Sequence, residues 1–138
     1  MKRTLCLLAV ALLFTACVNN NECKVSIGDA TFQCDPNSAA YSGLNHVGGY
    51  EYFTGGHRGV VVVRLTLNEF MAFERTCPCD NDSRVVVSSD YGAQVLECPT
   101  CRTLFSTNNY GNPMDGAATR CPLYQYSTRY TGGILYVY

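Results

Sequence analysis

The stretch Cys77-Pro-Cys79, together with Cys98-Pro-Thr-Cys101, is the most informative part of this 138-residue chain. Residues 80–97, eighteen in all, separate the two cysteine loops. Two short loops that each supply two thiolates are typical of soft-metal sites, because each loop then binds one side of the metal. The proline in each loop fixes its own φ and restricts the preceding residue, which lowers the entropy lost on binding. The spacing therefore predicts a metal site with these four cysteines as ligands.

The segment between the two loops is expected to be a β-hairpin. The runs Val85-Val86-Val87-Ser88 and 93–97 flank the turn Ser89-Asp90-Tyr91-Gly92. A hairpin brings its two ends together, so Cys79 and Cys98 can approach each other despite the residues between them. The hairpin thus explains how the chain assembles one site from two loops.

The remaining sequence predicts an all-β fold. Short runs rich in valine, tyrosine, phenylalanine and threonine alternate with glycine, asparagine, aspartate and serine turns, and no helical periodicity is present. The near-continuous apolar run at 60–67 predicts a central strand, with 70–74 as its neighbour. Further strands are expected near 50–54, 124–130 and 134–138, the last two as a hairpin around Thr131-Gly132-Gly133.

Several motifs around the cysteine loops occur together in one known family. Gly59-Val60-Val61-Val62-Val63-Arg64 and the segment 70–78 look like strands that lead into a first cluster loop, and 98–105 is similar to a second loop with the strand leaving it. The segments 112–120, 123–126 and 134–137 resemble the Gly/Pro loop and closing hairpin of that family. Over residues 59–138 the chain resembles the Rieske domains, whose loops carry Cys-x-His and Cys-x-x-His.

The resemblance implies a fold and a ligand set. The expected domain, residues 23–138, is a Rieske-like antiparallel β-sandwich with a small rubredoxin-like cluster-binding subdomain, whose loops span 76–82 and 97–103. Cys77 and Cys98 would hold one iron of a [2Fe-2S] cluster, as the two family cysteines do. Cys79 and Cys101 stand where the family has histidines, and they would hold the other iron.

Four thiolates change the chemistry expected of such a cluster. They favour the oxidised form and lower the potential toward about −400 mV, from about −150 to +300 mV for the histidine-ligated type. Proton-coupled behaviour, which imidazole ligands permit, is lost as well. The resemblance therefore implies a one-electron carrier that serves a protein redox partner. No Ser/His/Asp set or phosphate-binding glycine loop is recognisable, so the chain is not expected to be an enzyme by itself.

Two other interpretations of the cysteines remain open. A closed structural zinc site would make the chain a scaffold or binding module, although the Cys-x-Cys spacing is tighter than zinc ribbons use. In an oxidising compartment the thiols could instead pair as disulfides and leave a metal-free interaction module. His46 and His57 do not follow a cysteine at Rieske spacing, and we expect both at the surface.

The N-terminus predicts export and lipid anchoring. Residues 1–16 combine the charged start Met1-Lys2-Arg3, a short apolar run and the small residues Thr15-Ala16, as secretory signals do. Cys17 follows directly, which resembles a bacterial lipobox whose cysteine is acylated, for example with palmitate. The alternative is an ordinary signal peptide cleaved near Ala16. If Cys17 is acylated, residues 17–22 form a short lipid-anchored linker.

The composition and the predicted lipid anchor limit the partners and the cellular location expected of the chain. With 10 Lys+Arg against 11 Asp+Glu, the net charge is −1, and no basic stripe suggests a nucleic-acid partner. Acyl chains would bind the membrane stably. The expected location is the bacterial cell envelope, with the outer membrane, facing the periplasm or cell surface, favoured by Val18 in place of aspartate after the lipidated cysteine.

Two further cysteines are candidates for a disulfide. Gly28-Asp29 suits a two-residue hairpin turn, and the resulting register places Cys23 opposite Cys34. Opposed cysteines can be bridged outside the cytoplasm, which makes Cys23–Cys34 a candidate disulfide; the alternative is that both are small buried apolar residues. Cys121 is then left over, either as a buried free thiol or as a competing ligand.

Overall fold

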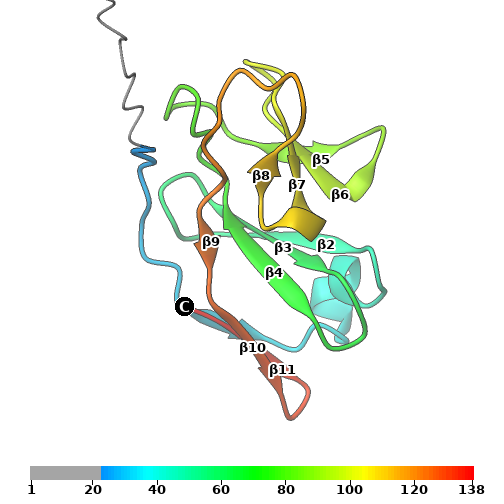
Figure 1. The fold of residues 1–138 in the computed structure, drawn as a ribbon. Coiled ribbons are helices and arrows are strands. Elements are labelled where there is room, and N and C mark those ends of the chain that lie inside the picture. The colour runs from blue at the N-terminus through cyan, green and yellow to red at the C-terminus, as the bar shows by residue number, and fades with distance from the viewer. Residues whose placement is uncertain (1–22) are drawn as a thin grey trace, which may run out of the picture.

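The computed structural model describes residues 23–138, and this part of the chain is an all-β protein (Figure 1). The all-β prediction is confirmed. The signal peptide 1–16, the lipidated Cys17 and the linker 17–22 lie outside the described residues. Within residues 23–138 no helix is long and apolar enough to cross a membrane. The elements are β1 (Phe32–Cys34), the 3-10 helix η1 (Ala39–Leu44), β2 (Tyr50–Phe53), β3 (Val60–Arg64), β4 (Phe70–Glu74), β5 (Val86–Ser88), β6 (Gly92–Glu97), β7 (Leu104–Ser106), η2 (Thr107–Asn109), β8 (Asn112–Pro113), β9 (Gln125–Tyr126), β10 (Thr128–Thr131) and β11 (Ile134–Val137).

The strands form three antiparallel sheets (Figure 1). The central sheet has the order β2-β3-β4-β9, a second sheet has β5-β6-β7-β8, and a third has β1-β11-β10. The hairpins predicted around 89–92 and 131–133 are present, because β5 pairs with β6 and β10 pairs with β11. The strand predicted at 124–130 is divided, since β9 pairs with β4 in the central sheet and only β10 belongs to the hairpin. Gly132 and Gly133 form the turn of the second hairpin at φ 59° and 82°, which is the geometry that two-residue type I′ turns require.

Strand β3 is the centre of the molecule. All five of its residues are buried, as its near-continuous apolar sequence predicts. Since neighbouring side chains of a strand point to opposite faces, Val60 and Val62 pack into one core and Val61 and Val63 into another. The chain therefore has two apolar cores, one on each face of the central sheet.

The second core carries the cysteine loops. Val61 and Val63 pack there with Phe73, Leu96 and Phe105. Cys77 and Cys98 belong to the same cluster and have no exposed surface. The position of both loops is thus fixed by close packing of large side chains beneath them.

The predicted hairpin at the start of the domain is wrong. Strand β1 pairs with β11 and not with the residues before it, and Cys34 lies opposite Leu135. The preceding segment 23–31 runs along the molecule and is held by long-range hydrogen bonds, with Gly56 N–H donating to Asp29 O at 2.9 Å. Burial of β1 beside β11 prevails over the local turn signal, because it buries the Cys34 side chain in the first core.

The predicted Cys23–Cys34 disulfide is wrong for the same reason. Cys23 is bonded to Cys121, 98 residues away in sequence, so Cys121 is not a spare thiol. Cys34 is a buried free thiol, and burial, followed by the nearby carboxylate of Asp35, raises its pKa to about 11. The disulfide ties the first described residue of the chain to the loop that precedes β9.

Candidate metal centre

The first cysteine loop begins directly after β4 and is closed by backbone hydrogen bonds. Cys77 N–H donates to Ser83 O at 2.8 Å, and Asn81 N–H donates back to Cys77 O at 2.8 Å. Asn81 has a left-handed backbone, φ 57°, which asparagine tolerates better than most residues. An isolated bridge between Thr76 and Arg84 seals the base of the loop.

The second loop, after β6, repeats this construction. Cys98 N–H donates to Thr103 O at 3.0 Å, and Arg102 N–H donates to Cys98 O at 2.9 Å. Arg102 is also left-handed, φ 60°, and like Asn81 it stands four residues after its cysteine. The two loops are therefore similar turns, each with a buried cysteine at its first position, although the bond that closes the first loop spans one residue more.

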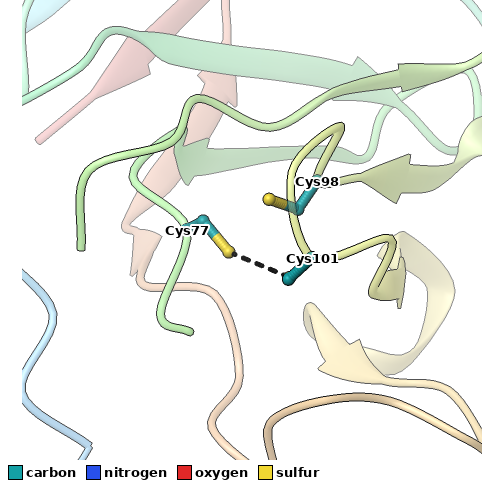
Figure 2. Close-up of side chains that lie close together, drawn as sticks. All are labelled: Cys77, Cys98 and Cys101. Atoms are coloured by element: carbon teal, nitrogen blue, oxygen red, sulfur yellow. Dashed lines mark hydrogen bonds between the residues drawn. The ribbon is translucent and has the colours of Figure 1, made fainter. Parts of the chain in front are cut away.

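The two loops bring three thiols together (Figure 2). The sulfur atoms of Cys77, Cys98 and Cys101 all lie within 4.8 Å of one another, and the Cys77 and Cys101 sulfurs are 3.7 Å apart. Cys77 and Cys98 are buried, and Cys101 is partly exposed. Neither His46 nor His57 belongs to this group. These three cysteines could hold a metal or a cluster.

Cys79, the fourth predicted ligand, lies at the outer edge of this group. Its side chain is exposed and is not among the three thiols that cluster. Loss of hydration, followed by the thiol of Cys101, raises the pKa of Cys79. The two loops differ in the position of their second cysteine. Cys79 is the third residue of the first loop, whereas Cys101 is the fourth residue of the second.

Asp80 takes the fourth position of the first loop, but its carboxylate is engaged within the loop. It accepts hydrogen bonds from Asp82 N–H at 3.0 Å and Ser83 N–H at 2.8 Å, and from the Ser83 hydroxyl. The hydrogen bond from the Ser83 hydroxyl is the main reason that the pKa of Asp80 is lowered. Asp80 therefore stiffens the loop, and its carboxylate is not part of the group that could hold a metal.

The thiols differ in how readily they ionise. Burial, with the neighbouring thiols of Cys98 and Cys101, raises the pKa of Cys77. Burial acts in the same direction on Cys101, but hydrogen bonds from Thr103 and from the thiols of Cys98 and Cys77 outweigh it and lower the pKa of Cys101 to about 7. Cys101 therefore presents a thiolate to a metal more readily than Cys77 does.

Thr103 is a site residue that sequence reasoning missed. Its buried hydroxyl lies 3.2 Å from Cys101 Sγ and accepts a hydrogen bond from Ala118 N–H at 3.2 Å. The neutral Cys101 thiol donates to this oxygen, and when Cys101 is ionised the hydroxyl can donate its own proton to the thiolate. The only signal in the sequence is a β-branched hydroxyl residue two places after a ligand.

Glu74 lies fully buried at the end of β4, below the first loop. Its carboxylate accepts five hydrogen bonds, from His57 N–H (2.7 Å), Arg58 N–H (2.9 Å), Thr76 N–H (3.0 Å), the Thr76 hydroxyl (2.9 Å) and the Tyr126 hydroxyl (2.8 Å). Burial alone would raise the pKa of Glu74, but these donors outweigh burial and hold that pKa below its usual value. Glu74 therefore joins the 56–58 loop, β9 and the start of the cysteine loop.

Replacing Glu74 by glutamine should destabilise the fold. Glu74→Gln removes the charge that five donors satisfy and turns one acceptor atom into a donor, so we expect a loss of about 3 kcal/mol in the free energy of unfolding. Urea unfolding measures this loss. The exposed Glu69→Gln is the matched control, with an expected change within about 0.5 kcal/mol. An equal effect of the two variants would contradict the role given to Glu74.

The same carboxylate predicts a dependence of stability on pH. The pKa of Glu74 in the folded state lies below that in the unfolded chain, about 4.3, so its contribution is complete above that pH. The contribution is lost as the pH falls through the folded-state pKa. Urea unfolding at a series of acidic pH values should show a steeper loss in the wild type than in Glu74→Gln. Parallel curves would exclude Glu74 as a main source of acid sensitivity.

Fold and site together define a small all-β domain with a candidate thiolate metal centre at its loop tips. No protein-family model matches the sequence, and no curated protein matches it. Among solved structures, the chain is similar to the ferredoxin of carbazole 1,9a-dioxygenase from Nocardioides aromaticivorans IC177, with 21% identity and a TM-score of 0.47. That match covers 67% of this chain and 86% of the ferredoxin chain.

Proposed function

We propose that this protein is a Rieske-like one-electron carrier with an all-cysteine [2Fe-2S] centre. The observation that carries the proposal is the arrangement of thiols in two similar loops. In the proposed centre Cys77 and Cys98, which are buried, would hold one iron, and the partly exposed Cys101 and the exposed Cys79 would hold the other. A binuclear centre needs this arrangement, because each of its two irons takes two protein ligands.

The protein's own residues supply what such a centre requires. The thiols of Cys77 and Cys98 rest on the second apolar core, which excludes water from that side. The Thr103 hydroxyl stabilises negative charge on Cys101, and the stiff loops fix the ligands before binding. When bound, the cluster supplies a one-electron couple. The exposed Cys79 then marks the edge at which a partner protein can approach most closely.

The second candidate is a structural zinc site, which one distance favours. With zinc–sulfur bonds of about 2.3 Å, the sulfurs of a tetrahedral site lie about 3.8 Å apart. The 3.7 Å between the Cys77 and Cys101 sulfurs matches this value. In the binuclear arrangement these two thiols bind different irons, so they would have to lie farther apart. Metal analysis decides between the two candidates.

We further propose that the carrier is a bacterial lipoprotein held at the outer membrane through Cys17. The support is the sequence pattern around Cys17 and the shortness of the linker 17–22, which spans at most about 20 Å when extended. In addition, Ser26 N–H donates a hydrogen bond to Asn81 Oδ1 at 2.6 Å, and Asn81 Nδ2 donates one to the Ser26 hydroxyl at 2.7 Å. The chain that leads to the anchor therefore runs beside the first cysteine loop. Metabolic labelling with a palmitate analogue, compared with Cys17→Ala, tests the anchor separately from the metal centre.

The proposed ligand set predicts a low potential that does not depend on pH. Since all ligands are thiolates, the midpoint potential should lie near about −400 mV and stay constant between roughly pH 6 and 9. Anaerobic redox titration followed by visible absorption measures it. A fall of about 59 mV per pH unit would indicate a coupled proton and contradict the proposed ligand set. A sample that takes up no electron would contradict the carrier function.

The Cys101 thiol gives the matching mutational test. We expect Cys101→Ser to abolish the visible and EPR signals of the centre, because a serine oxygen is a harder and weaker ligand than a thiolate. Retention of the full signal would exclude Cys101 as a ligand. Arg102→Gln, beside it on the exposed loop, is a control that leaves every thiol in place.

A further inference from the structure

A basic hollow lies beside the first cysteine loop and contributes no ligand to the proposed centre. It has a volume of about 440 Å³ and lies between the 52–59 segment and the two arginines that flank the first cysteine loop, Arg75 and Arg84. Three arginines and one histidine line it, and no acidic side chain does so among the described residues. The whole chain has a net charge of −1, so this surface differs from the average of the protein. Its lining residues include Tyr52, His57, Arg58, Gly59, Arg75 and Arg84.

The guanidinium of Arg75 is held in one orientation. Its Nε donates to Val85 O at 2.9 Å, and its Cζ lies 3.8 Å above the centre of the Tyr52 ring. These contacts leave the two Nη groups as donors, and within residues 23–138 no hydrogen bond or ion pair engages them. A guanidinium fixed through Nε and its face is prepared to bind an oxyanion through its Nη groups, because little side-chain entropy remains to be lost.

Arg84 supplies a second cation that nothing nearby neutralises. Its side chain is exposed and forms no ion pair or hydrogen bond with the part of the chain that the structure describes. It lies close enough to Arg75 for their like charges to interact. An anion between the two guanidinium groups would relieve this repulsion.

The neighbouring acids do not fill this role. Asp82 is paired with Arg58, and Glu74 is buried with five hydrogen bonds to its oxygens. Gly59, with φ 99°, keeps the backbone beside Arg75 free of a side chain, since a Cβ there would lie 3.8 Å from Arg75 Nη1. The space next to the guanidinium is therefore open to a small ligand.

We propose that this hollow binds a small oxyanion carrying at least two negative charges, such as a phosphate or pyrophosphate group, between the guanidinium groups of Arg75 and Arg84. Two guanidinium groups can each give parallel N–H donors to a tetrahedral oxyanion, and such charge-assisted bonds are about twice as strong as neutral ones. The bound anion would lie beside the loop that carries Cys77, yet the site depends on no metal ligand.

Calorimetric titration of the full-length protein with pyrophosphate tests the site, with ionic strength held constant by chloride. The wild type should bind saturably, and Arg84→Gln should weaken binding about tenfold, because it removes charge-assisted hydrogen bonds. Arg84 makes no side-chain contact that the fold requires, so the variant should unfold at the wild-type temperature. Arg84→Lys should retain an intermediate affinity, since it keeps the charge and loses the paired donors.

The control is Arg129→Gln on β10, an exposed arginine that stacks on Tyr136 away from the hollow. This variant should bind pyrophosphate as the wild type does. Any one of three results overturns the proposal. The first is no saturable binding of pyrophosphate by the wild type, and the second is an affinity of Arg84→Gln within about twofold of the wild-type affinity. The third is equal weakening by Arg129→Gln, which would indicate non-specific charge attraction. Metal content and the visible spectrum, measured on the same samples, report the proposed centre independently.

Discussion

Replacing Cys77 by serine should leave the purified protein without the metal of the proposed centre. Cys77 is fully buried, lies within 4.8 Å of two further thiols, and belongs to the apolar core below the site. Water therefore cannot easily take the place of its sulfur, and a serine oxygen is a poor ligand for a soft metal. Cys98→Ser should have the same effect, because Cys98 has the equivalent position in the second loop.

The loss of metal should be larger for a buried thiol than for an exposed one. We expect metal content near zero for Cys77→Ser and Cys98→Ser, and a smaller loss for the exposed Cys79→Ser, where solvent can supply a replacement ligand. Metal analysis of proteins purified in parallel measures this order. Cys34→Ala is the matched control, since Cys34 is a buried free cysteine in the other core. Wild-type metal content in Cys77→Ser, or equal loss in Cys34→Ala, would contradict the assignment.

Removal of the Cys23–Cys121 disulfide should have the largest effect on stability. The bond closes a loop of 98 residues, nearly the whole described domain. In the chain-entropy model, a loop of about 100 residues contributes about 4.7 kcal/mol by restricting the unfolded chain. The double variant Cys23→Ser/Cys121→Ser should therefore lose about 4 kcal/mol of unfolding free energy.

Guanidinium unfolding with the metal content matched between samples measures this loss. The slope of the unfolding free energy against denaturant should increase in the variant, because an unbridged unfolded chain exposes more surface. The Ser26 to Asn81 hydrogen bonds remain in the variant and keep the 23–31 segment near the first loop. A change below about 1 kcal/mol, with the slope unaltered, would mean that the bridge restricts the unfolded chain little.

The parts of the fold that the sequence predicted are those determined locally. The apolar run at 60–67 predicted a central strand, and residues 60–64 form one that is buried throughout. The turns at 89–92 and 131–133 have the glycines that hairpins need. The approach of Cys77 to Cys98 and Cys101 follows from the hairpin between them. Short-range patterns therefore sufficed for the all-β class and for most of the thiol group.

Long-range pairing accounts for what the sequence did not predict. Gly28 and Asp29 carry a turn signal, but β1 pairs with the distant β11, and this pairing places Cys34 in the first core. The bridge from Cys23 to Cys121 depends on that tertiary path. The exposure of Cys79 and the hydroxyl of Thr103 beside Cys101 likewise depend on how two distant loops meet, which no spacing rule contains.

Determination of iron, acid-labile sulfide and zinc in anaerobically purified protein, with EPR after dithionite reduction, tests the central claim most directly. The proposed centre predicts two irons and two sulfides per chain, and an EPR signal from one unpaired electron in the reduced state. A colourless protein with one zinc per chain would contradict the electron-carrier function and establish the structural zinc site instead. A metal-free protein with Cys77, Cys79, Cys98 and Cys101 paired as disulfides would exclude both.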